Sequence, residues 1–291
     1  MDTKDVSFLF EGGRDGVLLL HGLTGTPAEM KSVGRGLARD GFTVYGMQLA
    51  GHCGTKENLL ATGWREWYSS ALEGLDFLAG RCERVFVAGL SMGALLAIQL
   101  AADHPETVAG IGLYSTSLRH DGWSVSRLNW LLPLLLLLPW GRRHCFPEAF
   151  PHGIKNERLR KRIVSLMSSG DSGSAGLTGT PGASLLELWR FRKVVMKAMP
   201  SVRTPALIVH ALQDDVTSLW NVNYLQDHLS GPVETVLLDD CYHMITIDQQ
   251  CNDVVSHTAR FFKKCGDAEN FVSSMQIPGF SSGEVLTRHA G

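Results

Sequence analysis

The feature that most limits the fold is an alternation of two hydrophobic patterns along the first 116 residues. Short apolar runs rich in β-branched residues are typical of buried strands, whereas apolar residues that recur every three or four positions form one face of a helix. The expected strands lie near 6–10, 17–20, 42–48, 84–89 and 108–114, and the expected helices near 28–39, 64–79 and 92–103. Such alternation predicts an α/β fold in which helices flank a mostly parallel central sheet.

The alternation stops near residue 118 and resumes after residue 200. Two more strands are expected at 205–211 and 233–238, and two more helices at 218–229 and 248–263. We therefore predict a core made of residues 1–117 and 201–265, a cap or lid inserted at 118–200, and a C-terminal tail at 266–291.

The predicted insertion differs from the core in composition. Residues 118–190 hold ten Lys and Arg against five Asp and Glu, so this part carries about +5 and the rest of the chain about −7. Eight leucines fall within residues 128–140, a stretch of 13 residues with two prolines, too short for the roughly 20 residues that cross a bilayer. The Gly/Ser-rich stretch 168–184 favours a flexible segment. An apolar, basic and partly flexible insertion is typical of a lid.

The overall charge and the cysteine pattern exclude several classes of protein. A net charge of −2 gives no basic excess for nucleic-acid binding. The first ten residues show no secretory signal, so we expect a cytoplasmic protein. Six scattered cysteines without a Cys-x-x-Cys pair argue against a zinc cage or a disulfide framework, and we expect reduced thiols.

The segment "FVAGLSMGALLAIQ", residues 86–99, places Ser91 between two glycines at the junction of an expected strand and an expected helix. A Gly-x-Ser-x-Gly match alone is weak evidence, since it arises by chance, and Ser91 would then be an ordinary turn serine. The strand–turn–helix setting favours a nucleophile on a strained turn, where Gly89 and Gly93 leave room for neighbouring backbones. The N-terminus of the following helix would stabilise negative charge beside Ser91.

A serine hydroxyl is a weak nucleophile at neutral pH, so this hypothesis requires a base and an orienting acid later in the chain. The segment "IVHALQDD" places Asp214 and Asp215 just after one expected strand, and "CYHMITID" places His243 just after the last strand. The chain order is then nucleophile, acid and base, as expected when a Gly-x-Ser-x-Gly turn follows a strand of such a sheet. From position alone, either aspartate can serve as the acid.

With these motifs, the chain resembles the α/β-hydrolase family, in particular its branch of bacterial carboxylesterases and monoacylglycerol lipases. The matching stretches are "VLLLHGLTGTPAEM", "GLSMG", "IVHALQDD" and "CYHMITID", which together extend from residue 17 to residue 248. The resemblance implies an α/β-hydrolase fold with an inserted cap. It also implies that Ser91 is the nucleophile, His243 the base and Asp214, rather than Asp215, the orienting acid.

The same resemblance assigns roles to residues of the loop 21–25 and to the residue after Ser91. The main-chain N–H groups of Leu23 and Met92 would form the oxyanion hole. Apart from the resemblance, we expect His21 to have a structural role in the loop 21–25 rather than to transfer protons, because a lone histidine is rarely catalytic. One departure from the family is Cys53, where the branch usually carries glycine, so we expect the loop 51–55 to be shaped differently. Neither Cys53 nor Cys241 lies in the serine turn, and we do not expect a reactive thiol at either position.

The predicted activity is the hydrolysis of carboxylic esters through an acyl-enzyme on Ser91, with no metal and no organic cofactor. A thioesterase or an acyltransferase would use the same three side chains and remains an alternative. A serine at position 91 excludes relatives whose nucleophile is aspartate, such as dehalogenases and epoxide hydrolases. The rival from another class is a binding protein that keeps the fold without the activity, but all three catalytic positions are filled here.

The leucines of the insertion suggest a small-molecule ester with a medium or long acyl chain. They would equally serve to bury the lid's own helix against the core. Arg142, Arg143 and the basic residues of 155–162 would favour transient contact with a lipid surface, or would form a solvated helix face.

Overall fold

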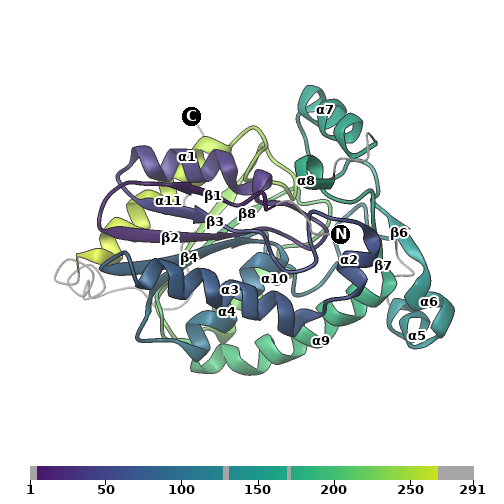
Figure 1. The fold of residues 1–291 in the computed structure, drawn as a ribbon, viewed down its shortest axis with the longest axis horizontal. Helices are drawn as coiled ribbons and strands as arrows, with labels where there is room; N and C mark the ends of the chain where they lie inside the picture. The colour runs from purple at the N-terminus through teal and green to yellow at the C-terminus, as the bar shows by residue number, and fades with distance from the viewer. Residues whose placement is uncertain (1–4, 127–130, 169–171, 268–291) are drawn as a thin grey trace.

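The computed structural model describes residues 5–126, 131–168 and 172–267. The centre of the fold is a seven-stranded sheet with the strand order β1-β3-β2-β4-β5-β8-β9 (Figure 1). Six of its strands are parallel, and only the edge strand β1 pairs antiparallel, with β3. The strands are β1 (Phe8–Phe10), β2 (Asp15–Leu20), β3 (Thr43–Gly46), β4 (Arg84–Leu90), β5 (Val108–Tyr114), β8 (Ala206–Ala211) and β9 (Val233–Leu238).

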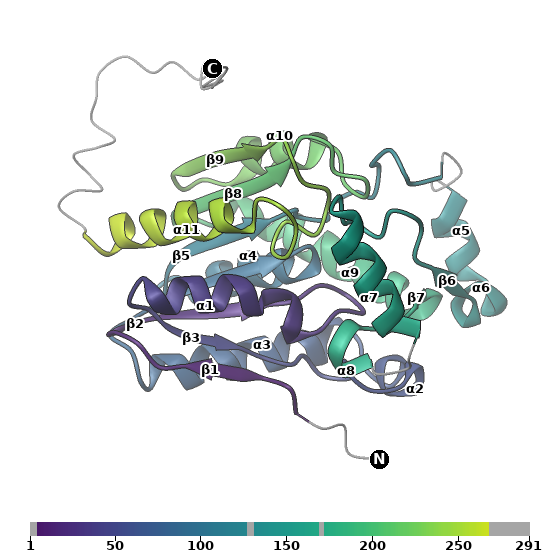
Figure 2. The same ribbon diagram turned by 90° about the horizontal axis from the view of Figure 1, so that it is seen from above.

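Helices cover both faces of the sheet, which explains why the central strands β2 and β4 carry no charged residue after their first position. Along β2, Val17 and Leu19 face a core shared with α1 (Lys31–Arg39) and α11 (Cys251–Gly266). Leu18 and Leu20 face the other core, shared with helices on the opposite side. Those helices are α3 (Trp64–Ala79), α4 (Met92–Asp103), α9 (Gly182–Ala198) and α10 (Trp220–His228). Figure 2 shows α1 and α11 side by side over the sheet.

The predicted α/β architecture is confirmed, element by element, in the core. Each expected strand and helix is present, with ends that coincide with the expected ones or shift by at most three residues. The helix expected near 28–39 divides into a 3-10 turn, Pro27–Met30, and α1, because Pro27 occupies the first turn. A short helix, α2 (Lys56–Leu60), was not predicted. Its five residues are too few to show a periodic apolar face.

The predicted insertion forms a group of short elements at the end of the sheet where the carboxyl ends of the parallel strands lie (Figure 1). These elements are α5 (Leu132–Leu137), α6 (Pro139–Arg143), β6 (Cys145–Pro147), α7 (Glu157–Ser168), α8 (Ser172–Ala175) and β7 (Gly179–Pro181). The strands β6 and β7 pair antiparallel as a separate ribbon. In the described part of the chain, no helix is long and apolar enough to cross a membrane.

Two parts of the insertion differ from what its composition suggests. The helix α9 packs on α3 and α4 of the core, and its Phe191 and Val195 are fully buried there. The Gly/Ser-rich stretch forms regular structure after residue 171, where Ser172 Oγ donates to the Gly54 carbonyl at 2.6 Å and the Leu177 N–H to the Thr24 carbonyl at 3.1 Å. The stretch that we expected to be flexible is therefore bonded to core loops at Ser172 and Leu177. Residues 169–171, and 268–291 of the predicted tail, lie outside the described residues.

Candidate active site

Ser91 lies on a sharp turn between β4 and α4, with φ of 57° and ψ of −110°. This is a strained backbone conformation for a residue with a side chain. The flanking glycines are needed for the turn, because a Cβ on Gly89 would lie 2.1 Å from the Gly93 carbonyl carbon, and a Cβ on Gly93 would lie 2.2 Å from the Leu20 carbonyl oxygen. The prediction that these two positions must lack side chains is confirmed.

Asp214 and His243, from loops that follow β8 and β9, are directly bonded. The Nδ1 of His243 lies 2.9 Å from Oδ2 and 3.1 Å from Oδ1 of Asp214. The carboxylate also accepts hydrogen bonds from the Val216 and Thr217 N–H groups and from the Thr217 hydroxyl. With Asp214 as acceptor, the Nδ1–H tautomer is fixed and the Nε2 lone pair is left for proton transfer.

Asp215 has a different place from its neighbour. Its Oδ1 accepts the backbone N–H of His243 at 3.2 Å, and its Oδ2 accepts the N–H of Gly153 at 3.1 Å. Asp215 therefore fixes the loop that carries the imidazole, whereas Asp214 contacts the ring itself.

The electrostatics of the pair favour an ionised acid beside a basic imidazole. Burial opposes ionisation of Asp214, but the charge and hydrogen bond of His243 outweigh it and lower the pKa of Asp214 to about 2. Burial likewise disfavours protonated His243, but Asp214 and then Asp215 outweigh it and raise the pKa of His243 above its ordinary value. The ring is therefore tuned to accept a proton.

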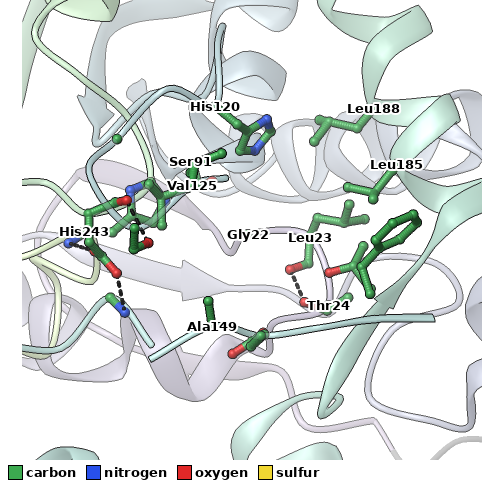
Figure 3. Close-up of a pocket in the computed structure, with 18 of the residues that line it drawn as sticks. Gly22, Leu23, Thr24, Ser91, His120, Val125, Ala149, Leu185, Leu188 and His243 are labelled. Carbon is green, nitrogen blue, oxygen red and sulfur yellow. Dashed lines mark hydrogen bonds between the residues drawn. The ribbon is translucent and has the colours of Figure 1, made fainter. Parts of the chain in front are cut away.

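Ser91 and His243 line the same cavity (Figure 3). In this structure the Oγ of Ser91 is hydrogen-bonded at 2.7 Å to the Oγ of Ser117. Ser117 is buried and follows β5, the strand next to the one that carries Ser91. Ser117 was not predicted, although the polar run "STS" directly after the strand 108–114 was a usable signal.

The two residues predicted to form an oxyanion hole lie beside Ser91. Leu23 lines the cavity, and Met92 is the first residue of α4, where an N–H has no acceptor within the helix. Within the described residues, neither N–H donates to another protein group. The loop before Leu23 is fixed by His21, whose Nδ1 lies 2.9 Å from the Gly22 carbonyl while its Nε2 accepts the Leu49 N–H at 3.2 Å.

The cavity has a volume of about 1230 Å³, large for a small-molecule site. Much of its apolar wall comes from the insertion: Leu132, Leu135, Leu136, Ile163, Met167, Leu185 and Leu188. The leucine-rich stretch thus has two faces. Leu135 and Leu136 line the cavity, while Leu134 and Leu137 are 59% and 61% exposed. Residues 127–130, which begin this stretch, lie outside the described residues.

Seven ionisable side chains in the cavity wall were not predicted: Glu29, Arg119, His120, Asp121, Glu148, His152 and Arg192. Glu29 lies within the matching stretch 17–30 but was not singled out there, and the others belong to the predicted insertion, where no motif marks them. Burial and the nearby Glu148 raise the pKa of Glu29 to about 8. Burial and the nearby His243 lower the pKa of His120 to about 4.

The cysteines are arranged as ordinary packing residues. Burial raises the pKa values of Cys53 and Cys241 to about 12, so both are thiols rather than reactive thiolates at neutral pH. Cys53 has φ of 62°, in the left-handed region that favours glycine, the residue usual in the family at this place. Among the described residues, no group of three or more His, Cys, Asp or Glu side chains is placed to hold a metal ion.

A serine on a strand–turn–helix, with a bonded aspartate and histidine on later loops at the same sheet edge, defines an α/β-hydrolase. The chain belongs to the family described as serine aminopeptidase, S33, which matches residues 13–250. It is 30% identical over 258 residues to a thermostable monoacylglycerol lipase from Bacillus sp. (strain H-257), covering 88% of this chain and 94% of that one. A carboxylesterase from Bacillus subtilis (strain 168) is 35% identical over 99 residues, 34% of this chain and 40% of the relative.

Solved structures agree with this placement. One reported for the metagenome-derived lipolytic enzymes LipS and LipT has a TM-score of 0.75 and 28% identity, and covers 89% of this chain and 97% of that one. The monoacylglycerol lipase of Paleococcus ferrophilus has a TM-score of 0.73 at 18% identity, covers 90% and 99% of the two chains, and shows the shared fold. The predicted membership of the branch of carboxylesterases and monoacylglycerol lipases is confirmed.

Proposed function

We propose that this protein hydrolyses carboxylic esters through an acyl-enzyme on Ser91, with His243 as the base and Asp214 as the orienting acid. The observation that carries the proposal is the direct bond between Asp214 and the Nδ1 of His243, in the cavity that also contains Ser91. The sequence similarity to a monoacylglycerol lipase over most of both chains supports esters as the substrate class.

In the proposed mechanism, His243 Nε2 takes the proton of Ser91 as Oγ attacks the ester carbonyl carbon. The N–H groups of Leu23 and Met92 stabilise the oxyanion, and the imidazolium then protonates the leaving alcohol. Water repeats the sequence on the acyl-enzyme, which releases the acid and restores the serine. For the attack to begin, the Ser91 hydroxyl turns from Ser117 toward the imidazole.

The size and lining of the cavity support a medium or long acyl chain. The apolar side chains of the insertion provide a surface that a hydrocarbon covers more favourably than water does. A panel of esters with two to sixteen acyl carbons, assayed with wild type and Ser91→Ala, tests this proposal. We expect the highest kcat/KM at eight carbons or more and no turnover by Ser91→Ala. A preference for the two-carbon ester contradicts the assignment of the acyl site.

The outer face of the leucine-rich stretch supports a second part of the proposal, contact with an anionic lipid surface. Leu134, Leu137 and Trp140 are exposed there, next to the exposed Arg142 and Arg143. Apolar residues beside cations are typical of segments that lie in a membrane interface. By contrast, two of the basic residues in 155–162 are already paired, Lys155 with Asp240 at 3.0 Å and Lys161 with Glu157 at 2.7 Å.

Flotation with phosphatidylglycerol vesicles tests the lipid contact. Wild type should co-float with these vesicles and a variant with Leu137→Ser and Trp140→Ser should not, while both hydrolyse a water-soluble ester equally. Equal flotation of the two proteins contradicts the contact.

The fold and the three side chains serve a thioesterase or an acyltransferase equally well. Assays with matched thioesters, and product analysis in the presence of alcohol acceptors, distinguish these activities from ester hydrolysis. We expect the free acid to be the main product from an oxygen ester.

A further inference from the structure

Arg192 lines the cavity that contains Ser91 and His243, and it is a half-buried cation without an acidic partner. Within the described residues, no carboxylate lies within ion-pair distance of its guanidinium. Its Nη1 donates to the Leu118 carbonyl at 2.8 Å, and its Nε is buried with no partner. Its guanidinium also lies 5.4 Å from the centre of the Trp189 ring. Most of its hydrogen-bond donors are therefore left for another group.

The neighbours of Arg192 on this side of the cavity do not neutralise it. Arg119, a cation that acts on Arg192, is already associated with Asp121 at 3.5 Å and with the Trp220 ring at 5.5 Å. Burial followed by the charge of Arg119 lowers the pKa of Arg192, which shows that its surroundings disfavour the charge. The structure thus keeps a cation in the cavity wall at an energetic cost.

His120 connects this side of the cavity with the reaction centre. It lines the cavity above Ser91 (Figure 3), and it interacts electrostatically with both His243 and Arg192. Because burial keeps its ring neutral at pH 7, His120 contributes hydrogen bonding and little charge. Because Arg119 is paired with Asp121, the positive charge without an acidic partner on this side belongs to Arg192.

We propose that Arg192 binds an anionic group, a carboxylate or a phosphate, that the ester substrate carries away from the scissile bond. This inference rests on the proposed ester hydrolysis and adds a charge preference to it. A planar guanidinium with free donors binds either oxyanion through paired N–H···O bonds, and the half-buried site strengthens that interaction. The apolar wall next to it would hold the hydrocarbon that joins the anion to the ester.

Two pairs of substrates test the proposal and separate the two sources of charge. In the phosphate pair, lauroylglycerol phosphate is compared with lauroylglycerol. In the carboxylate pair, the p-nitrophenyl monoester of a dicarboxylic acid is compared with the p-nitrophenyl ester of a fatty acid of equal length. In at least one pair, wild type should prefer the anionic ester, and Arg192→Met should lower the anionic-to-neutral ratio of kcat/KM by about 10-fold or more.

The matched control is Arg190→Met, which removes a cation from the same helix. Arg190 is mostly exposed, pairs with Glu187 and does not line the cavity, so both ratios should stay within about twofold of wild type. Arg192→Gln keeps a donor for the Leu118 carbonyl without the charge, and it replaces Arg192→Met if that variant fails to fold. Unchanged ratios in both pairs would overturn the proposal.

A binding experiment keeps this test separate from the proposed hydrolysis. Titration calorimetry with decyl phosphate, decanoate and decanol on wild type and Arg192→Gln requires no turnover. We expect the variant to bind one or both anions about 10-fold more weakly than wild type does, with decanol unchanged. If no ester is hydrolysed but this loss is found, the proposed function fails and the anion site stands. If esters are hydrolysed without this loss, the anion site fails alone.

Discussion

The carboxylate of Asp214 lies 2.9 Å from the Nδ1 of His243, whereas its neighbour Asp215 accepts the backbone N–H of the same histidine at 3.2 Å. Asp214 thus fixes the ring of His243, and Asp215 fixes its backbone. In Asp214→Asn the amide oxygen would stay with the Val216 and Thr217 N–H groups, so the NH2 group would face Nδ1, favour the other tautomer and leave the imidazolium without its counter-charge. We expect kcat/KM to fall by about 10³–10⁴-fold. Asp215→Asn keeps an acceptor for the backbone, and its kcat/KM should fall by less than about 10-fold. Equal losses in kcat/KM would contradict this division of roles.

The pH dependence of kcat/KM should show two limbs. The pKa of His243 is raised above its ordinary 6.5, so activity is lost as the pH falls through that raised value and the base becomes protonated. Glu29, with a pKa of about 8, is neutral at pH 7 and ionises as the pH rises through about 8. Its carboxyl packs against Gly25 of the oxyanion loop, where an added Cβ would lie 2.4 Å from both oxygens. A negative charge on Glu29 would repel the oxyanion that forms during the reaction. We therefore expect kcat/KM to fall above pH 8.

Glu29→Gln isolates the alkaline limb, since glutamine has the same shape and does not ionise. The variant should match wild type near pH 7 and lose the decline above pH 8, while the acid limb remains. If activity still declines above pH 8 in Glu29→Gln, the decline is caused by another group.

The 2.7 Å hydrogen bond between Ser91 and Ser117 predicts a modest effect on the rate. Ser117 is bonded to the hydroxyl of the nucleophile, and within the described residues it makes no hydrogen bond to His243, so we assign it a role in positioning the hydroxyl and none in proton transfer. A neutral hydrogen bond contributes about 0.5–1.5 kcal/mol, and Ser117→Ala should change kcat by no more than about 10-fold. The variant should still react with a fluorophosphonate at Ser91. Complete loss of labelling in the folded variant would give Ser117 a larger role than we assign.

The tight contacts around the serine turn predict an effect on stability. In Gly93→Ala the new Cβ would lie 2.2 Å from the Leu20 carbonyl oxygen, where neither backbone can move freely. We expect a loss of about 3 kcal/mol in the free energy of unfolding, measured with urea, or failure to fold. Gly80→Ala is the control, since the nearest atom to its Cβ would lie at 3.6 Å. Its stability should stay within about 0.5 kcal/mol of wild type.

The strands and helices of the core could be predicted because the apolar periodicity that marks each of them is set by residues close together in the sequence. Ser91, Asp214 and His243 could also be found, since each directly follows an apolar strand and such ends share one edge of a parallel sheet. The antiparallel pairing of β1 leaves no such local signal, because pairing direction depends on where the chain turns back.

The cavity wall was harder to predict. Glu29, His120 and Arg192 lie in different elements and meet only when the insertion folds over the core, so no spacing relates them. The leucine-rich stretch could be recognised as amphipathic or buried only in part, because α5 is too short to show a periodic face, although its Leu135 and Leu136 line the cavity while Leu134 and Leu137 are exposed. The regular structure of the Gly/Ser-rich stretch depends on bonds to Gly54 and Thr24, more than 100 residues earlier.

The most direct test of the central claim is mass spectrometry of the protein after reaction with a fluorophosphonate. We expect one adduct per chain, located on Ser91 by peptide sequencing, with none on folded Ser91→Ala and strongly slowed labelling of His243→Ala. A folded wild-type protein that forms no adduct, or forms it on another residue, would contradict the assignment of Ser91 as an activated nucleophile.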